Sequence, residues 1–116
     1  MLYICNVFTI AMAPQGGTLR FRRITSAEAA NIIGTTERDS APIVQAVGHE
    51  QTAKLANADI GSDLVKYNRI SVRLESGDEL LICQYVGPRL PEGATTLPEG
   101  AEFVWYYATF VGGCQI

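Results

Sequence analysis

The residue best suited to proton transfer is His49, the only histidine of the chain, which follows Gly48 at the predicted start of a helix. Histidine gains and loses a proton near neutral pH, so it can protonate the leaving oxygen of a phosphate ester. The first turn of a helix also presents backbone N–H groups and the positive end of the helix dipole, and both attract phosphate. Position alone favours the plainer interpretation that His49 caps the helix or packs against it.

Two arginines and one asparagine could bind an anion. Arg69 stands at the start of a predicted strand, and Arg89 lies in a loop with Glu92 three residues further on. A guanidinium group matches phosphate oxygens in a forked geometry, but composition alone favours ordinary surface arginines and a weak loop pair with Glu92. Asn6 is polar within an apolar run, so its amide needs a partner, either local backbone or a site at the strand end.

Several other site chemistries lack support in the sequence. The chain contains no phosphate-binding glycine loop, no GxSxG serine motif and no HExxH metal motif. Its three cysteines are odd in number and widely spaced, which argues against a disulfide framework and a structural zinc site. Zinc bound by Cys5, Cys83, Cys114 and His49 is an alternative that this spacing disfavours. We therefore expect no metal and no cofactor.

Length and composition indicate one globular domain over residues 1–116, with 47% hydrophobic residues and a net charge of −3. The acidic balance argues against polymeric DNA as a partner, whereas a few arginines gathered in one pocket could still bind a small anion. Charged residues make up only 18% of the chain, a hint that a second copy covers part of the surface. Without a signal-peptide pattern or an apolar run of ~20 residues, we expect a cytoplasmic protein with no membrane partner.

Hydrophobic periodicity predicts an α+β domain in the order β-β-α-β-α-β-β-β, with two or more helices packed on a mixed sheet of five or six strands. A continuous apolar run predicts that the first strand is central, and the turn after it predicts a hairpin with the second strand. A capping box opens the first helix, which we expect to end near Gly34, and Gly61 ends the second. The predicted strands cover residues 2–10, 18–24, 42–47, 68–75, 80–86 and 103–111.

The segment from residue 87 to residue 100 is rich in proline and glycine, which predicts a long loop. Loops of this length in small domains often act as lids or binding elements. Arg89 and Glu92 both lie in it.

Four short segments occur in this order along the chain: Asn6-Val7-Phe8-Thr9-Ile10, Val47-Gly48-His49-Glu50-Gln51-Thr52, Asn68-Arg69-Ile70 and Arg89-Leu90-Pro91-Glu92-Gly93. In this order and at this spacing they resemble the viral ring nucleases, which are anti-CRISPR proteins that degrade the cyclic tetra-adenylate messenger of type III CRISPR systems. Four positions depart from the family pattern: Thr9 replaces a serine, Ala11 an asparagine, Gln51 a serine and Pro91 often a glutamate.

The resemblance implies a homodimer that holds cyclic tetra-adenylate across its two-fold axis and cleaves it without a metal. A ribose 2′-hydroxyl would attack the adjacent phosphorus and leave linear di-adenylate with a 2′,3′-cyclic phosphate. The family's general acid maps to His49, and its catalytic loop residues map to Arg89 and Glu92. The expected ligand-binding residues are Asn6, Thr9, Gly48, Thr52 and Arg69.

Two other functions remain open at this point. The first is a dimer that sequesters a cyclic nucleotide without cutting it, and the second is a small viral protein that binds another protein. The state of the phosphodiester after incubation separates the enzyme from the sequestering dimer. Failure to bind any nucleotide would favour the protein-binding alternative.

Overall fold

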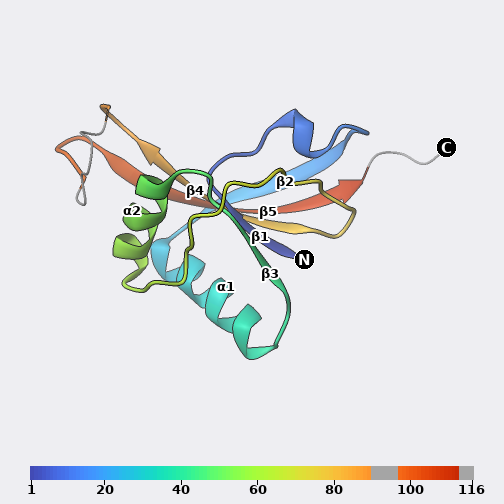
Figure 1. Ribbon diagram of the computed structural model, residues 1–116, viewed down its shortest axis with the longest axis horizontal. Helices are drawn as coiled ribbons and strands as arrows, with labels where there is room; N and C mark the ends of the chain where they lie inside the picture. The colour runs from blue at the N-terminus through green and yellow to red at the C-terminus, as the bar shows by residue number, and fades with distance from the viewer. Residues whose placement is uncertain (90–96, 113–116) are drawn as a thin grey trace.

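A five-stranded mixed sheet forms the centre of the computed structural model, which describes residues 1–89 and 97–112 (Figure 1). The strand order is β2-β5-β4-β1-β3, with β1 parallel to β3 and β4, and β5 antiparallel to β2 and β4. The predicted α+β class, with helices on a mixed sheet, is confirmed. The strands are β1 (Leu2–Cys5), β2 (Gly17–Ile24), β3 (Ile43–Ala46), β4 (Glu79–Val86) and β5 (Glu102–Gly112).

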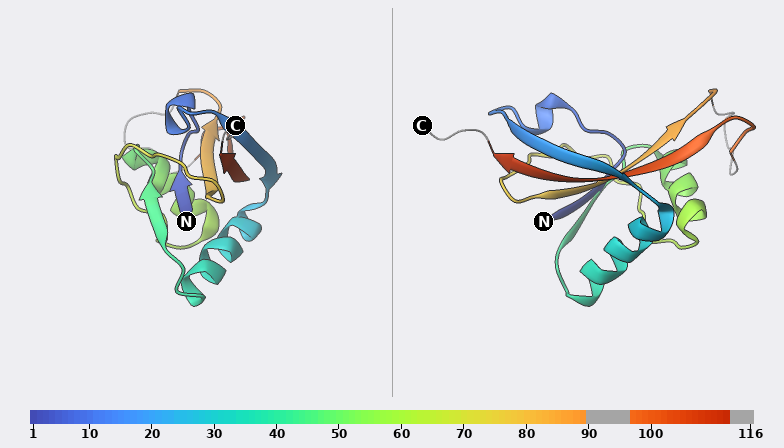
Figure 2. Two further views of the ribbon diagram at one scale, coloured as in Figure 1. Left: turned by 90° about the vertical axis from the view of Figure 1, so that its right-hand side faces the viewer. Right: turned by 180° about the vertical axis from the view of Figure 1, so that it is seen from behind.

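Both α-helices lie on one face of the sheet, and the segment that contains the short helix η1 lies on the other (Figures 1 and 2). The helices are α1 (Ser26–Arg38), α2 (Glu50–Ile60) and the 3-10 helix η1 (Ile10–Met12). In the part of the chain that the structure describes, no helix is both long and apolar enough to cross a bilayer.

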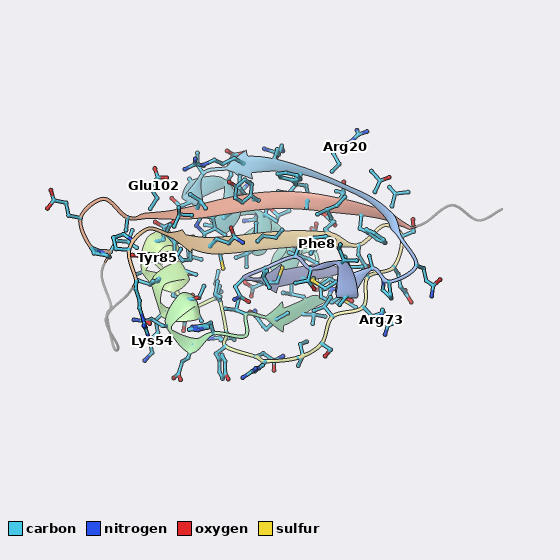
Figure 3. All side chains as sticks on the ribbon, turned by 90° about the horizontal axis from the view of Figure 1, so that it is seen from above. Phe8, Arg20, Lys54, Arg73, Tyr85 and Glu102 are labelled. Atoms are coloured by element: carbon cyan, nitrogen blue, oxygen red, sulfur yellow. The ribbon has the colours of Figure 1, made fainter. Side chains whose placement is uncertain are left out.

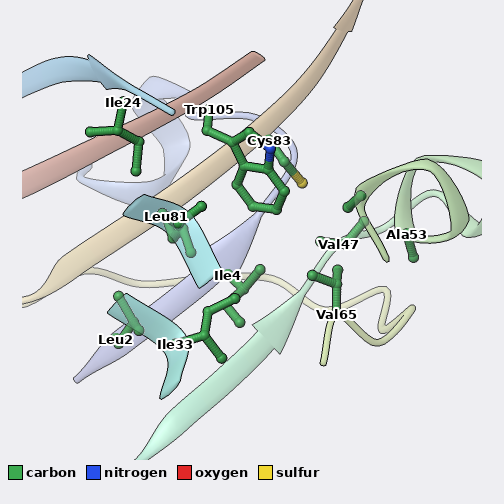
Figure 4. Close-up of a cluster of buried hydrophobic side chains, with 12 residues drawn as sticks. Leu2, Ile4, Ile24, Ile33, Val47, Ala53, Val65, Leu81, Cys83 and Trp105 are labelled. Atoms are coloured by element: carbon green, nitrogen blue, oxygen red, sulfur yellow. The ribbon is translucent and has the colours of Figure 1, made fainter. Parts of the chain in front are cut away.

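Each face of the sheet carries its own buried cluster, because side chains alternate along a strand. On β1, Leu2 and Ile4 pack in the cluster under the helices, and Cys5 packs in the cluster on the opposite face. Trp105 is the largest fully buried side chain and lies in the helix-side cluster (Figure 4). Its indole Nε1 donates a hydrogen bond to Asp59 Oδ2 at 2.8 Å, which ties α2 to β5.

Several predicted boundaries are confirmed. Thr25 is the N-cap of α1 and forms a reciprocal capping box with Glu28, so both ends of the first helical turn are satisfied. Gly61 ends α2 in the left-handed conformation, with a φ of 66°. β1 lies between β3 and β4, as its continuous apolar run predicted.

The predicted hairpin of the first two strands is wrong. Both edges of β1 are occupied by the parallel strands β3 and β4, so β2 pairs instead with β5 at the far side of the sheet. The first strand also ends at Cys5 rather than at residue 10. The residues after it cross the sheet face opposite the helices, where Phe8 and Met12 pack against the buried cluster.

The expected end of the first helix at Gly34 is also wrong, because α1 continues to Arg38 and its C-cap is Asp39. Side-chain bonds support this extra turn: Thr36 Oγ1 donates to the Ile32 carbonyl at 2.8 Å, and Arg38 donates to Thr35 Oγ1 at 3.0 Å. These polar groups let the helix run on past its apolar stretch.

The predicted strand at residues 68–75 is absent, since this segment joins no sheet. Its alternation of apolar and polar residues nevertheless reflects burial. Leu74 is a member of the buried cluster on the sheet face opposite the helices, and Val72 packs against that cluster. The Leu74 N–H donates to the Met12 carbonyl at 2.8 Å, and one isolated bridge joins Tyr67 to Val47. The segment runs past the outer side of β3 (Figure 3).

Candidate functional site

The candidate site is a cavity of about 820 Å³ at the carboxyl ends of β1 and β3. The segment that contains η1 forms one wall, and residues 69–73 form the other. Ligand sites in sheets with parallel strands commonly lie just beyond the carboxyl ends of those strands. The lining residues are Cys5, Asn6, Val7, Thr9, Ala11, Met12, Ala46, Gly48, His49, Arg69, Ile70, Ser71, Val72 and Arg73.

Parallel pairing explains why Asn6 and Gly48 meet, although they lie 42 positions apart. Cys5 is in register with Ala46, so both chains leave the sheet side by side. The Gly48 N–H donates a hydrogen bond to Asn6 Oδ1 at 3.2 Å, and both residues line the cavity. The amide of Asn6 thus accepts from distant rather than local backbone, and Asn6 also lines the cavity at the strand end, so its contact with a ligand stays a prediction.

His49 is the N-cap of α2, with an extended backbone (φ −135°, ψ 115°), and it is exposed. Its side chain makes no capping hydrogen bond, so the interpretation that the imidazole caps the helix is wrong. Its exposure likewise argues against a packing role. The ring lines the cavity without a hydrogen-bond partner among the described residues, and it is therefore available to a ligand.

Arg69 is held beside Gly48 by its neighbour Asn68. The Asn68 N–H donates to the Val47 carbonyl at 2.8 Å, and its side-chain amide donates to the Gln45 carbonyl at 2.7 Å. The Cγ atom of Arg69 lies 3.6 Å from the point where a Cβ on Gly48 would stand. The arginine stem therefore packs along the backbone just before His49.

The cavity has a positive lining in a chain whose net charge is −3. No aspartate or glutamate is among its described lining residues, whereas two arginines and His49 are. Four other basic side chains form ion pairs, namely those of Arg22, Arg23, Lys54 and Lys66. Within the described residues, Arg69 and Arg73 form no ion pair. Such a lining suits an anionic ligand.

Thr52, on the first turn of α2, lines a second cavity of about 300 Å³, and Asn6 lines both cavities. The second cavity is also lined by Cys83 and by two β4 residues, Gln84 and Tyr85, that sequence reasoning did not select. Their position at the carboxyl end of β4, parallel to β1, was a usable signal. Thr9 lies exposed at the N-cap of η1, on the first cavity.

Arg89 is exposed just after β4 and contributes to neither of these two cavities. The loop that leads to it is anchored by the Tyr85 hydroxyl, which donates a hydrogen bond to the Pro88 carbonyl. Glu92 and Pro91 lie outside the described residues, so the expected pairing of Arg89 with Glu92 stays a prediction.

Cys5 and Cys83 are buried free thiols on adjacent strands, and burial raises the pKa of each to about 12. Both therefore stay protonated at neutral pH, which suits packing rather than nucleophilic chemistry. Within residues 1–89 and 97–112, no three His, Cys, Asp or Glu side chains are grouped as metal ligands. Cys114 lies outside these ranges.

Comparison with known proteins adds the following findings. A family model described as STIV B116-like matches residues 2–106. The solved structure of B116 of Sulfolobus turreted icosahedral virus (STIV) matches with a TM-score of 0.75 and 23% sequence identity, over 93% of this chain and 97% of that chain. At that identity the likeness shows a shared fold. No curated protein matches this chain.

Proposed function

Because this chain belongs to the STIV B116-like family, and its motifs resemble those of viral ring nucleases, we propose that it is a metal-independent ring nuclease. It binds cyclic tetra-adenylate and cuts it to linear di-adenylate with 2′,3′-cyclic phosphate ends, which switches off type III CRISPR signalling. The observation that carries this proposal is the exposed imidazole of His49 beside Arg69, on a cavity with no carboxylate among its described lining residues; within residues 1–89 and 97–112 the ring has no hydrogen-bond partner.

The proposed reaction uses a nucleophile that belongs to the substrate. The ribose 2′-hydroxyl gives up its proton to solvent and bonds to the adjacent phosphorus, while the bond from phosphorus to the 5′-oxygen breaks. The imidazolium of His49 donates its proton to that 5′-oxygen, and it regains one from water for the next cut. Catalysis then rests on positioning and protonation, which need no metal.

The residues around His49 supply the binding groups in this proposal. Arg69 binds the phosphate that is attacked, since its stem already lies beside Gly48. Asn6, Thr9 and Thr52 offer polar atoms on the two adjoining cavities. Arg89 and Glu92 are the further catalytic residues that the family resemblance implies.

The site is completed by a second copy of the chain. A ring with four equivalent nucleotides has two-fold symmetry, and an isologous dimer supplies each binding group twice. The sheet face opposite the helices supports a dimer, because an apolar groove of about 290 Å³ on it stays open. Phe21, which lines this groove, is 62% exposed and packs edge-to-face on Tyr106 at 5.9 Å.

A single-turnover assay tests the proposal. Purified protein in excess is incubated with radiolabelled cyclic tetra-adenylate in EDTA, beside His49→Ala as the acid-deficient variant. We expect the wild type to form linear di-adenylate, and the variant to bind the ring but cut it about 10²–10⁴-fold more slowly.

Other outcomes would contradict different parts of the proposal. Tight binding by the wild type without conversion would mean a protein that sequesters the ring. Equal cleavage by both proteins would remove His49 as the general acid. Cleavage that occurs only when EDTA is omitted would mean that the reaction needs a metal. Absence of any ring binding would favour a protein-binding role through the apolar groove.

A further inference from the structure

The second arginine of the cavity, Arg73, belongs to none of the segments that resemble ring nucleases. It is exposed, it lines the cavity, and it forms no hydrogen bond or ion pair within the described residues. An arginine that makes no ion pair or hydrogen bond within the described residues, on a cavity with no carboxylate among its described lining residues, is a candidate for binding an anion.

The segment that carries Arg73 is pinned at both ends. At one end, Asn68 bonds to the Val47 and Gln45 carbonyls, and at the other the Leu74 N–H donates to the Met12 carbonyl at 2.8 Å. Leu74 is only 7% exposed and belongs to the buried cluster on this face. Arg73 is therefore attached to a fixed stretch of backbone rather than to a loose loop.

The two arginines are held at opposite ends of this wall. Arg69 packs beside Gly48, next to His49, whereas Arg73 adjoins the Met12 end (Figure 3). Arg73 is four positions after Arg69, which allows their Cα atoms to lie as far apart as about 14 Å. The alternation along the segment sends Val72 and Leu74 inward and leaves Arg69, Ser71 and Arg73 on its exposed side.

We propose that Arg73 binds a different phosphate of the ligand from the one that Arg69 binds. Each chain then engages two phosphates: the reacting one beside His49, and a second one at the η1 end of the cavity. This inference rests on the proposed function and assigns Arg73 as a binding residue. It also makes ligands with several phosphates better substrates than those with one.

The test measures equilibrium binding of cyclic tetra-adenylate in a His49→Ala background, where the ring stays intact. Arg69→Ala, Arg73→Ala and the double variant are compared at low and high salt. Arg38→Ala is the matched control, since Arg38 is an exposed arginine on α1, across the sheet from the cavity. Thermal melts verify that each variant is folded.

We expect Arg73→Ala to weaken binding roughly ten- to a hundredfold at low salt, as for loss of a charged hydrogen bond, and less at high salt. Arg38→Ala should bind like its parent. If the arginines bind separate phosphates, the double variant should lose the product of the two single losses within about twofold.

Two results would overturn the inference while leaving the proposed function intact. Binding by Arg73→Ala as tight as that by Arg38→Ala would make Arg73 a solvated surface group. Alternatively, the double variant could bind no more weakly than Arg69→Ala, which would mean that both arginines share one phosphate. Failure of the proposed function is distinct, because it is seen in the wild type and the His49→Ala parent before any arginine is changed, as absence of ring binding, absence of cleavage or equal cleavage by the two proteins.

Discussion

The amide oxygen of Asn6 accepts a hydrogen bond from the backbone N–H of Gly48, and this bond joins the two strand ends that bracket the candidate site. It fixes the residue directly before His49, so the position of the imidazole depends on a side chain that lies far from it in the sequence, 42 positions before Gly48. Asn6 also contacts both cavities, which gives it a structural and a ligand-binding role.

Substitutions at Asn6 should separate these two roles. Asn6→Ala leaves the Gly48 N–H without its partner and should lower the free energy of unfolding by about 1–3 kcal/mol. Asn6→Asp keeps an acceptor and should retain most of that stability, but its negative charge should weaken ring binding. Urea unfolding and ligand titration of both variants measure the two effects. Equal stability of the three proteins would remove the structural role.

Gly48→Ala tests how closely a ligand approaches this backbone. The added Cβ would meet only Arg69 atoms, at 3.6 Å or more, so the fold should tolerate it within about 1 kcal/mol. Because the methyl group narrows the gap beside Arg69, we expect weaker binding of cyclic tetra-adenylate at nearly unchanged thermal stability. Unchanged affinity would show that the ligand does not contact Gly48.

Gly87 should be indispensable where β4 passes into the loop of Arg89. Its φ is 153°, and a Cβ there would lie 2.8 Å from Ala101 Cβ and 2.9 Å from Ala101 Cα. Gly77→Ala is the matched control, with a φ of 95° and nothing within 4 Å of the added Cβ. The control should cost about 1–3 kcal/mol of unfolding free energy through backbone strain alone. Gly87→Ala should cost more, and similar losses would show that Ala101 yields easily.

The buried thiols should make the protein sensitive to alkali. Burial raises the pKa of Cys5 and Cys83 from 9.0 to about 12, so the fold favours their protonated form. This stabilisation is fully present below pH 9 and is lost as the pH rises toward 12. Each thiol should lower the unfolding free energy by up to about 1.4 kcal/mol per pH unit in that window.

Urea titrations under reducing conditions at several pH values above neutrality measure that slope. Cys83→Ala should make the decline above pH 9 shallower, because one of the two buried thiols is gone. Comparing slopes, rather than absolute stabilities, removes the packing cost of the substitution. An unchanged slope would contradict the assignment to Cys83.

The anchor of the cavity wall can be tested at Leu74. Leu74 is 7% exposed, so Leu74→Ala should destabilise the fold by about 2–5 kcal/mol and loosen the wall that carries Arg73. Ile70, on the same wall but 44% exposed, supplies the control Ile70→Ala, which should cost much less. Hydrogen exchange of the Leu74 N–H should accelerate in the first variant and not in the second.

Local signals in the sequence predicted the elements well, and long-range pairing poorly. The capping box at Thr25 and the terminating Gly61 were readable because each acts within one helical turn. The pairing of β2 with β5 joins segments about eighty residues apart, and no local pattern records it. Alternation at residues 68–75 predicted a strand, yet this segment joins no sheet, and its alternation instead places Val72 and Leu74 against the sheet face.

The same limits apply to the site. His49, Gly48 and Asn6 were selected from their types and from a family resemblance, and the cavity brings them together with Thr9 and Arg69. Arg73 was overlooked because its surroundings depend on how residues 69–73 cross the sheet, which sequence alone did not give.

The placement of β5 in the sheet has a consequence for biogenesis. Its residues, Glu102–Gly112, follow those of the other four described strands in the chain, and among the described strands it is β5 that joins β2 to the rest of the sheet. A nascent chain on the ribosome therefore carries β2 without its partner strand until β5 has been synthesised, and unpaired edges invite aggregation. Arg20, Arg22 and Arg23 on this strand supply charges of the kind that discourage such pairing.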